Sequence, residues 1–152
     1  MAAALELTRW RGLSGWSLRD LATAVGARTN VIRHHVGNRA DVEAAVVAEA
    51  CAGIGLPVHG EWVDWIRALA GRMRAAFDRY PGVGTVAATG TGPAAPMLEA
   101  IAERLADAGF GAESGLAARA VLAEICLSRG PGLDLLLAGL TARLAGLGGE
   151  RW

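Results

Sequence analysis

Apolar side chains recur along most of this chain at the spacing of an α-helix, and no segment alternates at the two-residue period of a half-buried strand. The clearest stripe lies between Trp62 and Tyr80 and ends at Pro81. A second stripe, of leucines, runs from Leu133 to Leu147. The pattern predicts an all-α protein. We expect helices over residues 2–11, 18–25, 29–36, 39–52, 61–80, 97–109, 116–127 and from 133 onward, with at most one weak helix around 85–88.

Helix-capping residues make two of these boundaries especially clear. Ser17 and Asp20 have the spacing of a capping box, in which each side chain accepts a hydrogen bond from the other residue's backbone N–H. Gly26 then provides a suitable helix stop. Asn38 and Asp41 repeat the capping arrangement at the start of a longer helix. These signals predict two short helices in close succession, followed by a longer one.

The length of 152 residues suits one domain or two small helical units that share a core. Residues 53–60 are rich in glycine and include Pro57, so they are the best candidate for a linker. We therefore expect one unit over residues 1–52 and a second unit over residues 53–152.

The hydrophobic content of 53% raises the question of a membrane-spanning segment. The longest stretch without charge, Tyr80–Leu98, contains Pro81, Pro93, Pro96 and four glycines. It therefore does not form the continuous apolar helix of about 20 residues that a bilayer requires. The start of the chain also lacks the charged segment followed by an apolar one that marks a secretory signal. We expect a cytoplasmic protein.

Charge is unevenly distributed along the chain, although fifteen basic and fifteen acidic residues cancel overall. Between Arg9 and Arg39 there are six arginines and one acidic residue, Asp20, which leaves a local excess of five positive charges. Such an excess is typical of a small module that faces a polyanion. A chance fluctuation in a window of this length is the alternative.

The helices expected at 18–25 and 29–36 are joined by Gly26-Ala27-Arg28, which gives them the dimensions of a helix-turn-helix. In that motif the second helix lies in the major groove with its N-terminal residues at the base edges. Here that helix offers Asn30, which suits adenine, and Arg33, which suits guanine.

The opposite side of the second helix carries apolar residues. Ile32 and Val36 are four positions apart, and we expect them to be buried against Leu21 and Val25 of the first helix. The polar residues then face outward. An ordinary helical hairpin with one solvated face is the alternative to a DNA-reading motif.

The segment from Trp16 to Val42 reads WSLRDLATAVGARTNVIRHHVGNRADV and resembles the DNA-binding signature of tetracycline-repressor-like (TetR-type) transcriptional regulators. The residues that match the family's pattern are Ser17, Leu18, Arg19, Leu21, Ala22, Gly26, Ile32, His35, Val36 and Asn38. Arg39 stands where the family usually has lysine. The later segments 80–83 and 133–140 also look like the ligand-binding half of this family, less specifically.

The resemblance implies a helix-turn-helix DNA-binding domain over residues 1–52 and a ligand-binding and dimerisation domain over residues 53–152. Arg39 would lie in the first turn of its helix, where the helix dipole disfavours a cation unless both converge on a DNA phosphate. His35 would either donate to a phosphate or pack against the first helix. The implied DNA-contacting residues are Ser17, Arg19, Thr29, Asn30, Arg33, His34, His35 and Arg39.

Two positions depart from the family's pattern. Arg28 stands where a serine usually caps the second helix, and the lost cap would cost about 1 kcal/mol. Arg33 stands in place of a tyrosine, so a cationic donor replaces a neutral one and the operator preference of relatives is not transferable.

The resemblance also places an effector pocket among the helices at 61–80, 97–109 and 113–128. Its expected walls are apolar, as ligand pockets usually are, and we expect Arg67 and Arg74 to lie in solvent. The alternative is that the apolar residues simply fill the core. The candidate ligand-binding residues are Trp65, Met73, Phe77, Met97 and Ile101.

The last two helices carry more apolar surface than one thin bundle needs, and a two-fold four-helix interface would bury it. Cys126 lies on the same face and is expected to serve packing. The expected dimer-interface residues are Leu116, Leu127, Leu133, Leu137, Leu140 and Leu144.

Three functions follow as hypotheses. The first is a homodimeric transcriptional repressor that binds a double-stranded DNA operator and is released by a small apolar effector. The second is a shortened relative that does not bind DNA and acts as a heterodimer partner or ligand-binding protein, which Arg28 and the missing basic N-terminal arm motivate. The third is a small helical enzyme. It is not expected, because His34, His35 and His59 show no metal-ligand spacing and no catalytic motif is present. We expect no metal and no cofactor.

Overall fold

The computed structural model describes the backbone of residues 1–149 and the side chains of residues 1–146. The described residues form helices and loops and contain no strand, which confirms the all-α fold. Leu147 lies outside the described side chains. The helices are α1 (Ala2–Arg11), α2 (Leu18–Ala24), α3 (Thr29–Val36), α4 (Arg39–Ala52), α5 (Trp62–Arg79), α6 (Val83–Ala87), α7 (Ala95–Leu105), α8 (Ser114–Leu127) and α9 (Gly132–Gly149).

The helix boundaries follow the local stop and start signals closely. α1, α3 and α4 have the predicted bounds, and α6 is the weak helix expected near 85–88. α7 begins before Met97 and passes into a π-helical turn, Ala106–Phe110, rather than continuing as an α-helix to Gly109. Gly109 has a φ of 111°, which is outside the helical range, so it ends the helix as expected.

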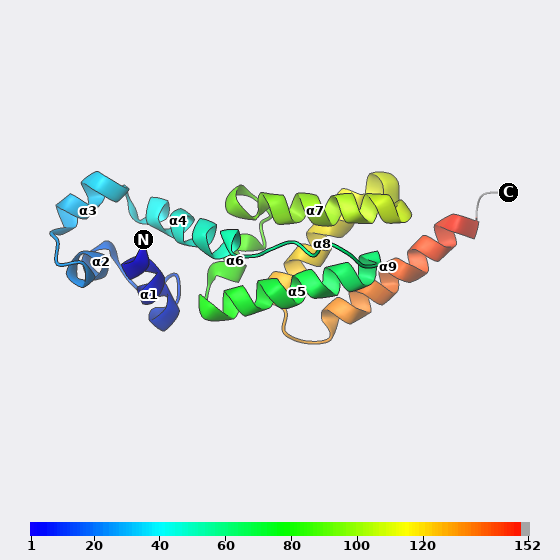
Figure 1. Ribbon diagram of the computed structural model, residues 1–152, viewed down its shortest axis with the longest axis horizontal. Coiled ribbons are helices and arrows are strands. Elements are labelled where there is room, and N and C mark those ends of the chain that lie inside the picture. The colour runs from blue at the N-terminus through cyan, green and yellow to red at the C-terminus, as the bar shows by residue number, and fades with distance from the viewer. Residues whose placement is uncertain (150–152) are drawn as a thin grey trace.

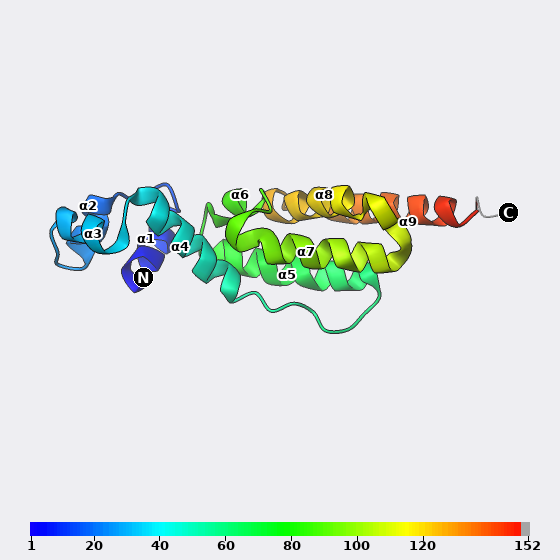
Figure 2. The same ribbon diagram turned by 90° about the horizontal axis from the view of Figure 1, so that it is seen from above.

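The molecule is elongated, with α1–α3 at one end and the end of α9 at the other (Figure 1). We call α1–α3 the head and α5–α9 the bundle. α4 leads from the head toward the bundle, and residues 53–61 then run along the bundle to the start of α5 (Figure 2). α5 runs back toward the head, so the corner between α5 and α6 lies beside the end of α1. The backbone N–H of Leu13 donates to the carbonyl of Pro81 there, at 2.8 Å.

One hydrophobic core runs from the head through α4 into the bundle. α4 supplies Val46 and Val47, which are 0% and 1% exposed, to the same core as the bundle helices. The glycine-rich segment at 53–60 therefore connects α4 and the bundle, which share one core. The largest fully buried side chains are Ile66, Leu69, Met73, Ile101, Leu105, Leu122, Ile125 and Leu137.

Arg74 does not lie in solvent, as we expected. Its Nε and Nη2 atoms are buried and have no hydrogen-bond partner among the described residues. On the same side of α5, Arg67 pairs with Asp134 at 3.1 Å, and Asp78 pairs with Arg129 at 2.6 Å. The first ion pair ties α5 to α9, and the second ties α5 to the segment between α8 and α9.

The charge-free stretch between residues 80 and 98 is divided among α6, a short 3₁₀ turn at Gly92–Ala94 and the start of α7. Within residues 1–149, no helix is both long enough and apolar enough to span a bilayer.

A buried hydrogen-bonded pair fixes α1 against the turn before α2. The Thr8 hydroxyl, which is 0% exposed, donates to the carbonyl of Ala4 at 2.8 Å. It also accepts the indole N–H of Trp16 at 2.9 Å, and Trp16 is itself 3% exposed. The Thr8 oxygen thus satisfies the Trp16 indole N–H, and the Ala4 carbonyl satisfies the Thr8 hydroxyl, as expected of buried polar groups.

Replacing Thr8 by valine keeps the shape of the side chain but leaves the Trp16 indole N–H without its acceptor. We expect Thr8→Val to lower the free energy of unfolding by about 1–3 kcal/mol in urea titration, the cost of a buried unsatisfied donor. Thr23→Val is the matched control, because the exposed Thr23 hydroxyl donates only to the Arg19 carbonyl in its own helix. It should change stability by less than about 0.5 kcal/mol. Equal losses in both variants would contradict this account.

Candidate nucleic-acid interface

The predicted helix-turn-helix begins at a complete capping box. Ser17 has an extended backbone with a φ of −121°, and its hydroxyl accepts the backbone N–H of Asp20 at 3.2 Å. The Asp20 carboxylate accepts the Ser17 N–H at 2.7 Å and the Ser17 hydroxyl at 2.6 Å. Asn38 and Asp41 form the same box at the start of α4. Local sequence therefore fixes where α2 and α4 begin, on either side of α3.

The capping box also sets the ionisation of its acid. Hydrogen bonds from the Ser17 hydroxyl and backbone N–H lower the pKa of Asp20 below its usual value, and the Arg11 guanidinium at 3.3 Å adds to the effect. Because these groups are exposed, the charged carboxylate is held mainly by directional hydrogen bonds rather than by a low dielectric.

α3 presents four of the predicted contact residues on one surface. Thr29, Asn30, Arg33 and His34 together line a shallow hollow of about 510 Å³. Thr29 is half-buried and the other three are exposed. Their positions recur at helical spacing, so they share one face of α3. The structure thus brings three hydrogen-bonding residues and one cation together on a surface open to solvent.

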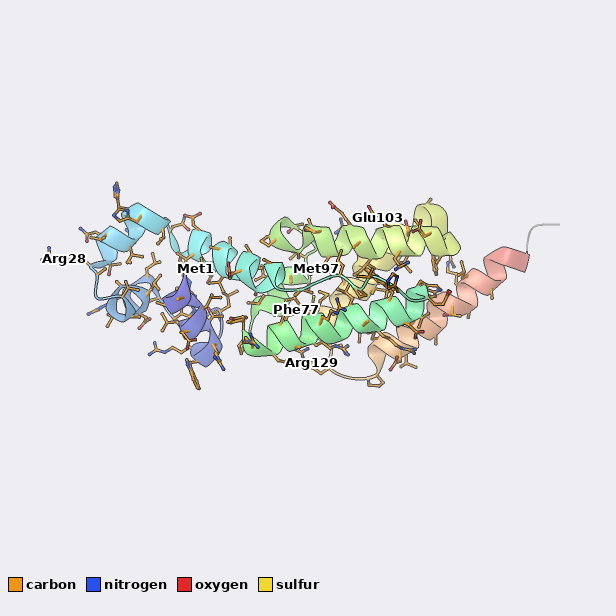
Figure 3. All side chains as sticks on the ribbon, in the orientation of Figure 1. Met1, Arg28, Phe77, Met97, Glu103 and Arg129 are labelled. Carbon is orange, nitrogen blue, oxygen red and sulfur yellow. The ribbon has the colours of Figure 1, made fainter. Side chains whose placement is uncertain are left out.

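Other predicted contact residues surround this face. Arg19 and His35 are exposed, and the His35 ring lies 5.3 Å from the His34 ring between centroids, at an angle of 74°. His35 is therefore not buried against α1. Arg28 precedes α3 without a side-chain cap, and its side chain points away from the molecule at the tip of the head (Figure 3).

The apolar side of α3 is less closely packed than we expected. Val25 and Val36 are 49% and 48% exposed instead of buried, while Ile32 is half-buried and Leu21 is 6% exposed. All four line an apolar groove of about 550 Å³, whose other walls come from α1 and α4. The helices of the head do not close over α3, and none of its residues is buried.

Arg39 differs from the other predicted contact residues, because its guanidinium has partners within the protein. Its Nε donates to the Glu43 carboxylate at 2.8 Å, and its Nη2 donates to the backbone carbonyl of Leu13. The guanidinium also lies over the Trp16 ring, 4.0 Å from the ring centre. Sequence reasoning missed this arrangement, since Leu13 is 26 residues away and contributes only a backbone atom.

The five predicted ligand-binding residues lie in the core. Figure 3 shows Phe77 on α5 and Met97 on α7, within the bundle. Each of the five is at most 4% exposed and belongs to the hydrophobic core. The set is Trp65, Met73, Phe77, Met97 and Ile101.

The predicted dimer-interface leucines differ widely in exposure. Leu116 and Leu127 are 77% and 61% exposed, Leu133 and Leu137 are 5% and 1% exposed, and Leu140 and Leu144 are half-buried. Leu135, which we did not predict because it lies off the leucine stripe, is 71% exposed. Part of the leucine stripe is therefore buried within the protein itself, where α9 packs on the core.

Comparison with solved structures identifies the fold. A structure of BioQ with its natural double-stranded DNA operator matches with a TM-score of 0.81 at 21% sequence identity, over 93% of this chain and 94% of that chain. Apo ActR from Streptomyces coelicolor gives a TM-score of 0.79 at 16% identity, over 96% and 94%. A TetR variant from Acinetobacter baumannii in complex with minocycline gives 0.72 at 23% identity, over 99% and 95%.

These matches extend over nearly the whole of both chains. Another of them is the TetR family protein ActR in complex with (S)-DNPA, with a TM-score of 0.76 at 17% identity over 95% of each chain. The chain therefore has the fold of TetR-type regulators, as the resemblance implied. No model of a protein family matches the chain, and no curated protein sequence matches it either.

The Asp20 capping box generates a prediction about pH. A carboxyl group whose pKa is lowered on folding contributes stability above its unfolded pKa of about 3.9, and this stability is lost as the pH falls through the lower folded value. The difference in unfolding free energy between the wild type and Asp20→Asn should therefore shrink as the pH falls from about 5 toward 2.

Urea unfolding at a series of pH values measures this difference. In a Ser17→Ala background the pH dependence should be weaker, because the largest cause of the lowered pKa has been removed. A difference that stays constant over the whole pH range would show that the charge of Asp20 does not support the capping box.

Proposed function

We propose that this protein is a DNA-binding transcriptional regulator, in which residues 1–52 read an operator and residues 53–152 bind an effector and form a homodimer. The observation that carries the proposal is the exposed face of α3, where Thr29, Asn30, Arg33 and His34 meet at one surface hollow. It lies at the end of the molecule remote from the bundle, in a chain with the fold of an operator-bound protein, BioQ (Figure 1).

Each residue type on this face suits DNA. Asn30 suits a bidentate contact to adenine and Arg33 one to guanine, while Thr29 offers both a hydroxyl and a methyl group. His34 and His35 add donors beside them. Ser17 and Arg19, at the start of α2, are placed to contact the backbone phosphates that flank the groove. The excess of arginine between residues 9 and 39 would draw the head to a polyanion.

The effector in this proposal is a small apolar molecule that enters the core between α5 and α7. Two proteins of the same fold were solved in complex with small molecules, ActR with (S)-DNPA and a TetR variant with minocycline, which supports a ligand-responsive bundle here. Because Met73, Phe77 and Met97 are already packed, a ligand would have to move helices apart to bind. It would then shift the population toward a head arrangement that does not fit the operator, which releases the repressor.

The dimer in this proposal forms through α8 and α9. Leu116, Leu127 and Leu135 are strongly exposed on these helices, and their burial against a second copy of the chain would be favourable. The half-buried Leu140 and Leu144 continue the apolar surface, whereas Leu133 and Leu137 support it from inside. A two-fold pair of such faces would place two heads at half-sites about 34–36 Å apart.

Fluorescence anisotropy with the DNA upstream of the protein's own gene tests the regulator directly. We expect nanomolar binding, preference over a scrambled duplex and a steep decrease of affinity between about 50 and 200 mM salt. Arg33→Ala should weaken binding by about 1–3 kcal/mol if it reads guanine. Arg79→Ala removes an exposed arginine from the bundle and should leave binding unchanged. Binding without preference at micromolar concentration would favour the heterodimer-partner hypothesis instead.

Size-exclusion chromatography with light scattering tests the dimer. Leu127→Glu places a charge in the middle of the proposed interface, so we expect a monomer at concentrations where the wild type is a dimer. Val58→Glu is the control, because Val58 is 76% exposed in the segment before α5 and lies outside α8 and α9. If Leu127→Glu remains dimeric, the interface lies elsewhere.

A further inference from the structure

The guanidinium of Arg39 is held on three sides by the protein. Glu43, one helical turn further along α4, accepts from Nε at 2.8 Å. The carbonyl of Leu13 accepts from Nη2, and the Trp16 ring lies beneath the guanidinium plane at 4.0 Å from its centre. The side chain is only 28% exposed. A guanidinium with this many fixed contacts has a defined orientation, with its Nη2 directed at the turn between α1 and α2.

The backbone of Leu13, in turn, is held at both its N–H and its carbonyl. Its carbonyl accepts from Arg39 at the start of α4, while its N–H donates to the carbonyl of Pro81 at 2.8 Å. Pro81 lies at the corner between α5 and α6. Leu13 is 5% exposed, so its polar atoms depend on these partners rather than on water. One residue thus connects the start of α4, directly after the head, to the bundle.

The close approach at this corner would make any side chain at Gly82 crowd Leu13. Gly82 has a φ of 91°, and a Cβ added there would lie 3.1 Å from the Leu13 Cβ and 3.3 Å from the Leu13 nitrogen. The corner and the turn are therefore in direct contact around the hydrogen bond. Trp16, the ring under Arg39, extends the connection to α1 through its bond to Thr8.

We propose that Arg39 is a positioning residue that locks the head to the α5–α6 corner through Leu13, and that it is not a phosphate ligand. The part of this inference that concerns DNA binding rests on the proposed function. If Arg39 swung out to a phosphate, it would leave the Leu13 carbonyl without its donor and expose the face of Trp16. The proposal also accounts for arginine where the family usually has lysine, since a planar guanidinium presents donors in fixed directions to a carbonyl and a carboxylate while it stacks flat on an indole.

The salt dependence of DNA binding separates the two roles. Each phosphate contact contributes about one unit to the slope of log affinity against log salt, whereas a positioning residue contributes to affinity alone. We expect Arg39→Gln and Arg39→Lys both to lower affinity about tenfold, within the range of remote coupling effects, at an unchanged slope. Arg19→Gln, a proposed phosphate contact, should reduce the slope. A reduced slope for Arg39→Gln with recovery in Arg39→Lys would overturn the proposal.

The corner offers an independent variant that lies far from any DNA contact. We expect Gly82→Ala to push Leu13 away and to weaken DNA binding, again without a change of slope. Gly92→Ala is the matched control, because Gly92 also has a positive φ, of 53°, but nothing lies within 4 Å of its added Cβ. Equal binding by the two variants would show that the corner does not position the head.

Amide hydrogen exchange on the free protein tests the lock without DNA. In Arg39→Lys, which keeps the charge, we expect the Leu13 amide and the amides of α3 to exchange about tenfold faster, while those of α8 are unaffected. Unchanged exchange at Leu13 would overturn the proposal even if the protein binds DNA. Faster exchange at Leu13 and α3 in a protein that binds no DNA would support the lock and refute the regulator function separately.

Discussion

The head depends on α4 for its stability. Its three helices have 10, 7 and 8 residues, and isolated helices of that length are marginal in water. α4 is longer, and its buried residues Val42, Val46 and Val47 belong to a core that continues from the head into the bundle. Because the same helix serves both parts, the head cannot rotate freely on a linker. Any movement of α4 relative to the bundle must carry α3 with it.

Within this frame, α3 is the least firmly held element. It has no buried residue, and its apolar side opens on a groove lined by Val25, Ile32 and Val36. Few buried contacts are typical of segments that open locally at low free-energy cost. A helix that is weakly held by its neighbours can adjust its orientation, which then depends on the elements at its two ends. Those ends are defined by the capping boxes of α2 and α4 and by the contacts of Arg39.

The sequence was informative where the determinants are local. Ser17 with Asp20 and Asn38 with Asp41 predicted the starts of α2 and α4, and both boxes are formed. The resemblance in the same segment led to the correct fold. The predictions that failed concern contacts between residues that are distant in the sequence. Periodicity puts Val36 on an apolar face but does not reveal whether a neighbouring helix covers that face. Likewise, nothing local to Arg39 indicates its bond to the Leu13 carbonyl, and nothing local to Arg74 indicates that its Nε and Nη2 are buried.

The placement of Phe77 links the proposed effector region to the proposed lock. Phe77 is buried in the last turn of α5, and its carbonyl accepts the N–H of Tyr80 directly before Pro81. A ligand that displaces Phe77 therefore acts one helical turn from the carbonyl that holds Leu13. Packed interiors do not absorb such a displacement by gradual deformation, because side chains and hydrogen bonds switch between discrete arrangements. Such a switch would act directly on the hydrogen bond between Leu13 and Pro81, which is one of the contacts that hold the turn between α1 and α2 against the bundle.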